Sequence, residues 1–405
     1  MAATGSVENM QSRRLVLSWG ALTATFAAGY GVMFTVLDDF RDEYGISARA
    51  LGVVVAVGFF TSFLVQVLVA PMADRGHARR LVFIGIIAEV VGLLIMAVGK
   101  DVYVLAAARV VMGIGAGAAL PAVRRIVILS DRDNLGSNVG TLLAADVAGF
   151  ATGPAISAVL VGPFGIAAPF LVIAVVTVGF VPMIARVHLE ERQVDAGTEA
   201  RFAFDLLRNR PYVAALCMGA AVFFMIGTFD SLWVIVLDDL HTAEWIANIG
   251  IVMFAVPMFL LGSIGGRLAQ RVGPFRVGTI GLLAGAMFLV LYGNAPSGMV
   301  IFWISMVHAI FDGLTVSSSG VAVGLVAPPE RQAGAQGLLG GVQTLTGGIA
   351  ALMAGWLYDV QGRAVAYGVA AGSMVVLIAG ARWFAGSMFH DRPVAAQPVD
   401  AIPAG

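Results

Sequence analysis

Twelve apolar runs, each close to the length that a helix needs to cross a bilayer, limit what this chain can fold into. A helix of about 20 mainly apolar residues spans the hydrocarbon core of a membrane. Lipid offers the backbone no hydrogen-bond partner, so runs of this length are expected to be helical. The sequence therefore predicts an all-α membrane protein with twelve transmembrane helices, near residues 15–37, 50–72, 80–99, 103–123, 138–162, 165–186, 212–236, 246–268, 277–295, 299–325, 333–357 and 364–386.

The composition argues against several other classes of protein. Of the 405 residues, 59% are hydrophobic and 12% are charged, whereas a globular domain has about 25% charged residues. A net charge of −1 without a basic run argues against nucleic acid as a partner. The single cysteine, Cys217, cannot build a disulfide framework. The sequence has no phosphate-binding glycine loop and no histidines at metal-ligand spacing, so we expect no enzyme, no cofactor and no metal site.

Charge and an internal repeat divide the chain into five parts. These are an N-terminus at 1–14, a helix bundle at 15–186, a linker at 187–211, a second bundle at 212–386 and a tail at 387–405. Within the linker, residues 202–207 predict a short amphipathic helix on the membrane surface, and the tail is expected to be disordered. Val-Leu-Asp-Asp at 36–39 recurs at 236–239, which indicates two parallel repeats.

The basic residues indicate how the helices are oriented. Most of the 24 lysines and arginines fall on one side of the predicted membrane, and the exceptions are Arg41, Arg49, Lys100, Arg363 and the intrahelical Arg109. Cytoplasmic loops of membrane proteins are enriched in Lys and Arg. Both ends of the chain are therefore predicted to be cytoplasmic, in a multi-pass protein of the cell (inner) membrane.

Residues 140–158 form an unusual membrane helix, rich in small residues and charged only at Asp146. Glycines in such a helix provide surfaces for close packing rather than weak points. The spacings of three and four residues place Asp146 on one face with Gly149 and Gly153. Pro154 removes a backbone hydrogen bond and predicts a kink.

This stretch resembles the fifth-helix signature of the drug:proton antiporters of the major facilitator superfamily. The match consists of Gly140, Gly149 and Gly153-Pro154 at the family spacing, followed by a small pair that is Ser157-Ala158 here. The resemblance implies two pseudo-symmetric six-helix bundles and alternating access. It also implies a monomer in the lipid bilayer that exchanges protons for a small-molecule substrate.

Residues 70–80 resemble the superfamily's loop signature, Gly-x-x-x-Asp-Arg-x-Gly-x-Arg-Arg, with Ala70 and His77 in place of two glycines. We expect Gly76 to adopt the left-handed turn that His77 cannot easily adopt. By resemblance, Asp74 faces the positive N-terminal end of the eleventh helix, and Arg79 or Arg80 pairs with Asp131 or Asp133. The candidate gating residues are Asp74, Arg75, Arg79, Arg80, Asp131, Gly149, Gly153 and Pro154. In the alternative interpretation, the arginines serve only to fix the topology.

Several ionisable residues lie inside the predicted helices, where each costs about 2.5–3.5 kcal/mol on the mildest scale. Arg109 begins an Arg-x-x-x-Gly-x-Gly sequence that resembles a fourth-helix motif of the family, whose arginine takes part in proton transfer. A carboxyl group away from water takes up a proton more readily. The proton-coupling candidates are Asp146, Asp230, His308, Asp312 and Arg109, with Ser305, Thr315 and Ser319 on the same polar stripe as His308 and Asp312. Structural hydrogen bonding is the alternative for each of them, and Glu89 is expected to meet either lipid or a partner.

Aromatic residues near Asp230 suggest what the cavity binds. Phe223, Gly227, Asp230 and Trp233 are expected to share one face of the seventh helix, and an acid among aromatic rings suits a lipophilic cation. The candidate substrate contacts are Tyr30, Phe34, Phe63, Phe223, Trp233 and Met253. Ordinary packing or lipid contact is the alternative for any one of them.

Taken together, these features predict a proton-coupled exporter (antiporter) of amphipathic or lipophilic small molecules such as drugs, which is a multidrug efflux function that confers antibiotic resistance. The first alternative is an importer or uniporter of a small metabolite (a sugar, organic acid or amino acid), whose cavity would be more polar. The second is a membrane receptor that transports nothing, and the intrahelical acids argue against it.

Overall fold

The computed structural model describes residues 2–186 and 202–389, and nearly all of this chain is helical. The α-helices of the first half are α1 (Ala2–Thr35), α2 (Leu37–Tyr44), α3 (Ala48–Leu68), α4 (Ala78–Val98), α5 (Val102–Ser130), α6 (Leu135–Phe164), α7 (Ala167–Val178) and α8 (Val181–Arg186). Those of the second half are α9 (Arg210–Asp239), α10 (Glu244–Val272), α11 (Pro274–Asn294), α12 (Gly298–Thr315), α13 (Ser318–Val326), α14 (Gln332–Gln361) and α15 (Arg363–Ala385). The segment η1 (Ala73–His77) is a kinked turn with non-helical backbone at Arg75 and Gly76, and η2 (Ala203–Arg208), η3 (Pro329–Arg331) and η4 (Gly386–Phe389) are short 3₁₀ segments.

The described residues contain twelve helical spans that are long and apolar enough to cross a membrane, as the sequence predicts. The predicted amphipathic helix in the linker is η2, a short 3₁₀ segment, and its place on the membrane surface stays a prediction. The remainder of the predicted linker, 187–201, and the tail beyond residue 389 lie outside the described residues. The boundaries assigned to the domains also stay a prediction.

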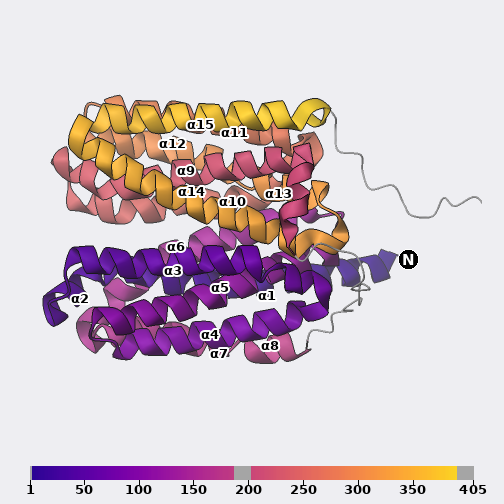
Figure 1. Ribbon diagram of the computed structural model, residues 1–405, viewed down its shortest axis with the longest axis horizontal. Coiled ribbons are helices and arrows are strands. Elements are labelled where there is room, and N and C mark those ends of the chain that lie inside the picture. Colours follow the sequence, from indigo (N-terminus) through magenta and orange to yellow (C-terminus); the bar gives the residue numbers. More distant parts are fainter. Residues whose placement is uncertain (1, 187–201, 390–405) are drawn as a thin grey trace, which may run out of the picture.

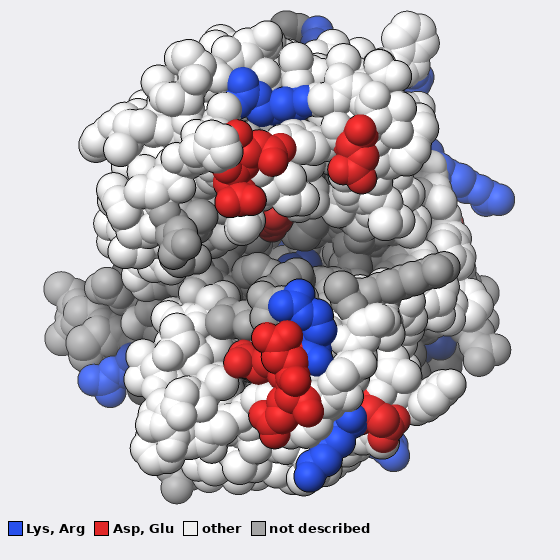
Figure 2. Space-filling view, turned by 90° about the vertical axis from the view of Figure 1, so that its left-hand side faces the viewer, with Lys and Arg blue, Asp and Glu red and all other residues white. Residues whose placement is uncertain are grey.

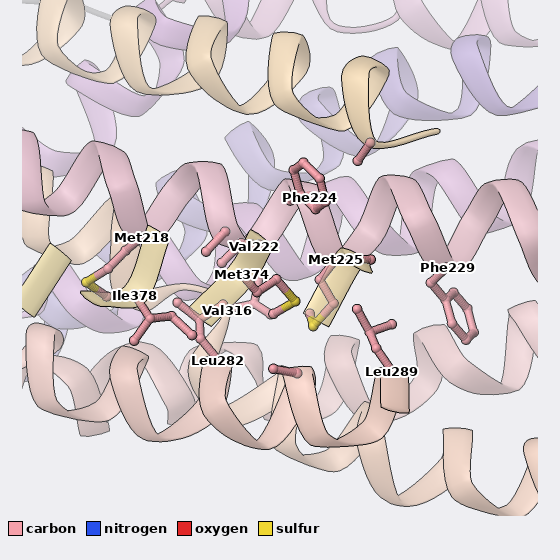
Figure 3. Close-up of a cluster of buried hydrophobic side chains, with 14 of the residues drawn as sticks. Met218, Val222, Phe224, Met225, Phe229, Leu282, Leu289, Val316, Met374 and Ile378 are labelled. Carbon is pink, nitrogen blue, oxygen red and sulfur yellow. The ribbon is translucent and has the colours of Figure 1, made fainter. Parts of the chain in front are cut away.

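Figure 1 shows the helices in two stacked halves, with α1–α8 in one and α9–α15 in the other. Each half has a hydrophobic core of its own. In the second half, Met218, Met225 and Phe229 of α9 pack with Leu282 and Leu289 of α11 and with side chains of α15 (Figure 3). The two-bundle fold predicted from the sequence is confirmed.

The two halves meet closely where α6 packs on α10. A Cβ atom added at Gly136 would overlap the carbonyl oxygen of Gly266, and one added at Gly140 would overlap that of Gly262. Small residues at a spacing of four let two membrane helices approach backbone to backbone. The glycines of the two helices are therefore paired across the boundary between the halves.

The contact of α14 with α3 is equally close at one end and absent at the other. A Cβ at Gly337 would lie 2.5 Å from the Cβ of Ala70, and one at Gly340 would overlap the side-chain oxygen of Gln66. Further along the same helices, Gly52 and Gly355 have nothing within 4 Å of an added Cβ. The halves thus touch at one end, which we call the closed end, and part toward the other, the open end.

Figure 2 looks onto the side of the molecule where α2 lies in Figure 1 and shows the surface hollowed between the two halves. Acidic side chains gather on both sides of this hollow. The N-terminus lies at the opposite side of the molecule in Figure 1. The open end therefore leads into a cleft between the halves, and the N-terminus is at the closed end.

Polar contacts join the halves at the closed end. The hydroxyl groups of Ser137 and Ser263 lie 3.0 Å apart. The side-chain oxygen of Gln270 accepts a hydrogen bond of 2.6 Å from the backbone N–H of Gly136, and its amide nitrogen donates to the carbonyl of Asp133 at 3.0 Å. The bond to Gly136 satisfies an N–H group in the first turn of α6, which has no partner within the helix.

This arrangement predicts a disulfide across the closed end. In a Cys217→Ser background, Ser137→Cys with Ser263→Cys places two thiols where the hydroxyls are 3.0 Å apart. Mild oxidation in membranes should join them and protect both from a maleimide reagent. The pair Gly52→Cys with Gly355→Cys serves as the control at the open end and should remain labelled. If the α6–α10 pair stays fully labelled after oxidation, the close approach of these helices is wrong.

Candidate functional site

The loop between the second and third spans is organised around Asp74. Gly76 has a φ of 81°, so it takes the left-handed turn as predicted, while His77 has an ordinary φ of −110°. The buried carboxylate of Asp74 accepts hydrogen bonds from the backbone N–H groups of Ala333 at 2.8 Å and Gly334 at 2.7 Å. These groups begin α14, so an anion lies at the positive end of that helix. The predicted position of Asp74 is confirmed, and its role in gating stays a prediction.

The cation beside Asp74 is one that the sequence analysis counted only as a marker of topology. The Nε atom of Arg125, on α5, lies 3.0 Å from Oδ1 of Asp74. Asp131 accepts hydrogen bonds from the backbone and side chain of Asn134 at the start of α6. The predicted pairing of Arg79 or Arg80 with Asp131 or Asp133 stays a prediction, as does a gating role for Arg75.

The glycines of the antiporter-like stretch on α6 have two different neighbours. Gly140 packs against α10 in the other half, whereas Gly149 and Gly153 pack against α1 within the first half. A Cβ at Gly149 would overlap the carbonyl oxygen of Ala24. The helix continues through Pro154. The gating roles of Gly149, Gly153 and Pro154, and the kink, stay predictions.

Arg109 is the centre of a buried polar cluster inside the first half. Its guanidinium lies over the ring of Tyr30 at 4.2 Å and interacts electrostatically with Glu89 of α4. Arg109 and Glu89 are both fully buried, and a Cβ at Gly58 would come within 2.8 Å of the Arg109 Nε atom. Among the described residues, neither the carboxylate nor the guanidinium has a hydrogen-bond partner. Of the two alternatives for Glu89, lipid is excluded, because the side chain is fully buried and interacts electrostatically with Arg109 of its own half.

A second polar cluster lies in the other half, around His308 and Asp312 of α12. The Nε2 atom of His308 lies 3.5 Å from Oδ1 of Asp312, and its Nδ1 atom lies 2.9 Å from the hydroxyl of Tyr292 on α11. When the tyrosine donates to Nδ1, the proton of the neutral imidazole is on Nε2, toward Asp312. All three side chains are buried. Tyr292 was missed because its residue type and apolar neighbours are typical of ordinary packing.

Asp312 reaches a pocket between the halves. It is lined by Asp312, Val316 and Ser317 from the second half and by Leu143, Ala144 and Val147 of α6 from the first, among others. A second pocket shares Leu143, Val316 and Ser317 with it and is lined by Arg124 of α5. Arg124 interacts electrostatically with Asp146 of α6. Candidates from both halves, Asp146 and Asp312, are thus associated with one region at the boundary of the halves.

The structure separates two residues that the sequence analysis placed on one face of α9. Asp230 is exposed, but Trp233 is 1% exposed and packs on Phe229, with ring centroids 4.9 Å apart. Three residues turn a helix by about 300°. Two residues at this spacing are therefore about 60° apart, and one can face the core while the other faces outward. Phe223 is half-buried beside Gly347 of α14.

The other candidate substrate contacts are dispersed. Tyr30 belongs to the Arg109 cluster, Phe63 lies close to α14 at the boundary of the halves, and Met253 is exposed on α10. The side chain of Phe34 lies outside the described residues. The substrate-binding roles of all six candidates stay predictions. Within residues 2–186 and 202–389, no group of three or more His, Cys, Asp or Glu side chains could hold a metal ion.

The Arg109 cluster predicts a thermodynamic coupling between two buried charges. Removing one partner of a buried pair costs about 3–5 kcal/mol, because the other charge is left uncompensated. Glu89→Gln and Arg109→Gln should each lower the unfolding free energy of the purified protein in detergent, and the double variant should lose clearly less than the sum. The exposed pair Arg41 and Asp42 is the control, and its double variant should unfold like the parent. Strict additivity at Glu89 and Arg109 would show that the two charges do not stabilise each other.

Comparisons with known proteins agree with this fold. The chain matches the Major Facilitator Superfamily over residues 19–243 and again over 228–403. It is 25% identical to multidrug resistance protein 2 of Bacillus subtilis over 67% of this chain and 70% of that protein. It is 28% identical to the quinolone resistance protein NorA of Staphylococcus aureus, over 32% of this chain and only 33% of that protein.

Solved structures show the same fold at low sequence identity. The crystal structure of the human organic anion transporter MFSD10 (TETRAN) superposes with a TM-score of 0.71 and 14% identity, covering 91% of this chain and 99% of that one. The transporter FucP in its outward conformation gives a TM-score of 0.71 and 16% identity, covering 91% and 98%. With both halves of the chain matched, this multi-pass membrane protein belongs to the Major Facilitator Superfamily of transporters.

Proposed function

We propose that this protein is a proton-coupled exporter of amphipathic or lipophilic small molecules such as drugs, working by alternating access in the cell (inner) membrane. The relatives named for multidrug and quinolone resistance support efflux, although they are distant. The antiporter-like stretch on α6 supports exchange over import. A gradient can drive this exchange, because one proton crossing about 150 mV releases about 3.5 kcal/mol.

The observation that carries the proposal is the contrast between the acids of the two halves. Glu89, Asp146 and Asp74 of the first half each have an arginine beside them. Among the described residues, Asp230 and Asp312 of the second half have no arginine or lysine partner, and Asp312 has only His308. A carboxylate without a cation at membrane depth is stabilised by taking up a proton or by binding a cationic substrate. The two ligands would compete for the same acid, which is the requirement for exchange.

The closed end supports a placement of the protein in the membrane. It carries the N-terminus, the basic loop around Asp74 and the start of η2 in the linker, and basic segments stay in the cytoplasm. We place the closed end at the cytoplasm and the open end outside. In this state the exposed Asp230 would exchange protons with the outside, whereas the buried Asp312 would do so only after the halves move. Rocking of the halves would then expose the acids to the cytoplasm.

The proposal predicts that Asp230→Asn and Asp312→Asn abolish substrate-induced proton release. In everted membrane vesicles energised by respiration, adding ethidium should release protons through the parent protein and not through either variant. Asp238→Asn, an exposed acid two turns from Asp230 on the same helix, is the matched control and should behave like the parent. Proton release that survives both substitutions, or export that persists after the pH difference and the membrane potential are collapsed, would rule out coupling through these residues.

A further inference from the structure

The strongest feature that the proposed function does not use is Arg124. It lies one turn and a half before the end of α5 and is half-buried, at a depth where an arginine requires a partner. Its neighbour Arg125 has such a partner in Asp74. Arg124 instead lines the pocket between the halves, together with Ser317, Ser319, Gln336 and Gln343 of the second half.

The guanidinium of Arg124 keeps its donors available. A guanidinium has five N–H donors, and in the described part of the chain Arg124 makes no hydrogen bond, only the electrostatic interaction with Asp146. The backbone of α14 lies close to it, because a Cβ added at Gly340 would be in van der Waals contact with its Nη1 atom, at 3.5 Å. On the opposite wall, the side-chain nitrogen of Gln336 donates a hydrogen bond to the carbonyl oxygen of Gly320 at 3.1 Å. This bond holds the amide of Gln336 in place.

The two adjoining pockets have opposite charges at their far walls. Arg124 lines only one of them and Asp312 only the other. The wall that both pockets share, Leu143, Val316 and Ser317, is largely apolar. In this state the pockets have free volumes of only about 10 and 30 Å³, so a ligand fills both only when the halves move apart. It then meets a cation, an apolar surface and an acid in sequence.

We propose that this double pocket binds zwitterionic amphiphiles, with the ligand's carboxylate on Arg124 and its amine toward Asp312. The inference rests on the proposed function and names the substrate class of the same site. Arginine suits a carboxylate because its planar fork donates two parallel hydrogen bonds. In the empty site Asp146 is the counter-charge of Arg124, and the carboxylate of the ligand takes over that position when it binds.

The test compares two fluorescent probes that differ in one group. Rhodamine B is a zwitterion with a free carboxylate, and rhodamine B ethyl ester is a cation. Binding to purified protein is measured by fluorescence anisotropy and export by loss of dye from loaded cells. Arg124→Gln should weaken binding and export of the acid by about tenfold or more, the loss expected for hydrogen bonds to a charged group. Binding and export of the ester should change less than about twofold. For the acid, Arg124→Lys should give values between those of the parent and of Arg124→Gln. Arg132→Gln, an exposed arginine beyond the end of α5, should leave both probes unchanged.

The outcomes separate this inference from the proposed function. Equal loss of both probes in Arg124→Gln would make Arg124 a structural or gating residue and overturn the inference. A parent protein that binds and exports the ester but not the acid would also overturn the inference. That result would still agree with the proposed export of drugs. Undiminished handling of the acid by a well-folded Arg124→Gln protein overturns the inference as well. A parent protein that neither binds nor exports either dye contradicts both proposals.

Discussion

Every charge that this chain carries into the membrane has to be compensated. The group that compensates a charged side chain determines which ligands that side chain can bind. In the first half arginine is the compensating group, with Arg109 beside Glu89, Arg124 beside Asp146 and Arg125 beside Asp74. In the second half the acids Asp230 and Asp312 lack such a partner within the described residues. The fold is pseudo-symmetric but its charge is not, so the two halves present different chemistry to the cleft between them.

This asymmetry assigns different functions to residues that look alike in the sequence. An acid with an arginine beside it already has a counter-charge within the protein, which favours its ionised form against the effect of burial. An acid without a cation is poised to bind a proton or a cationic group. Asp74 is of the first kind, since it accepts hydrogen bonds from two backbone N–H groups and lies 3.0 Å from Arg125. Asp312 is an acid of the second kind. It lies beside His308, which contacts Tyr292, and it lines a pocket between the halves.

The sequence predicted the elements of this fold and missed much of their orientation, for a physical reason. Span positions follow from hydropathy alone, and the left-handed Gly76 and the position of Asp74 follow from local backbone chemistry and a known motif. Which face of a membrane helix turns inward is harder to predict, because lipid and protein interior are both apolar and the periodic signal is weak. That is why Trp233 was placed beside Asp230 and why Glu89 was left between lipid and a partner. Arg124 and Arg125 were hidden for another reason, since arginines near a helix end are expected for topology alone.

The helix α6 shows how one stretch can serve two kinds of packing. Its first turns, with Gly136 and Gly140, are pressed against α10 of the other half, and its later turns, with Gly149 and Gly153, against α1 of its own half. If the halves rock about their boundary, only the first set of contacts has to separate, while the second holds α6 in its bundle. Between the two sets lies Asp146, at the level where the halves diverge and beside Arg124. This charge pair lies within the first half, and Arg124 faces second-half residues across the pocket, so the backbone contacts of α6 with α10 hold the two walls of that pocket together.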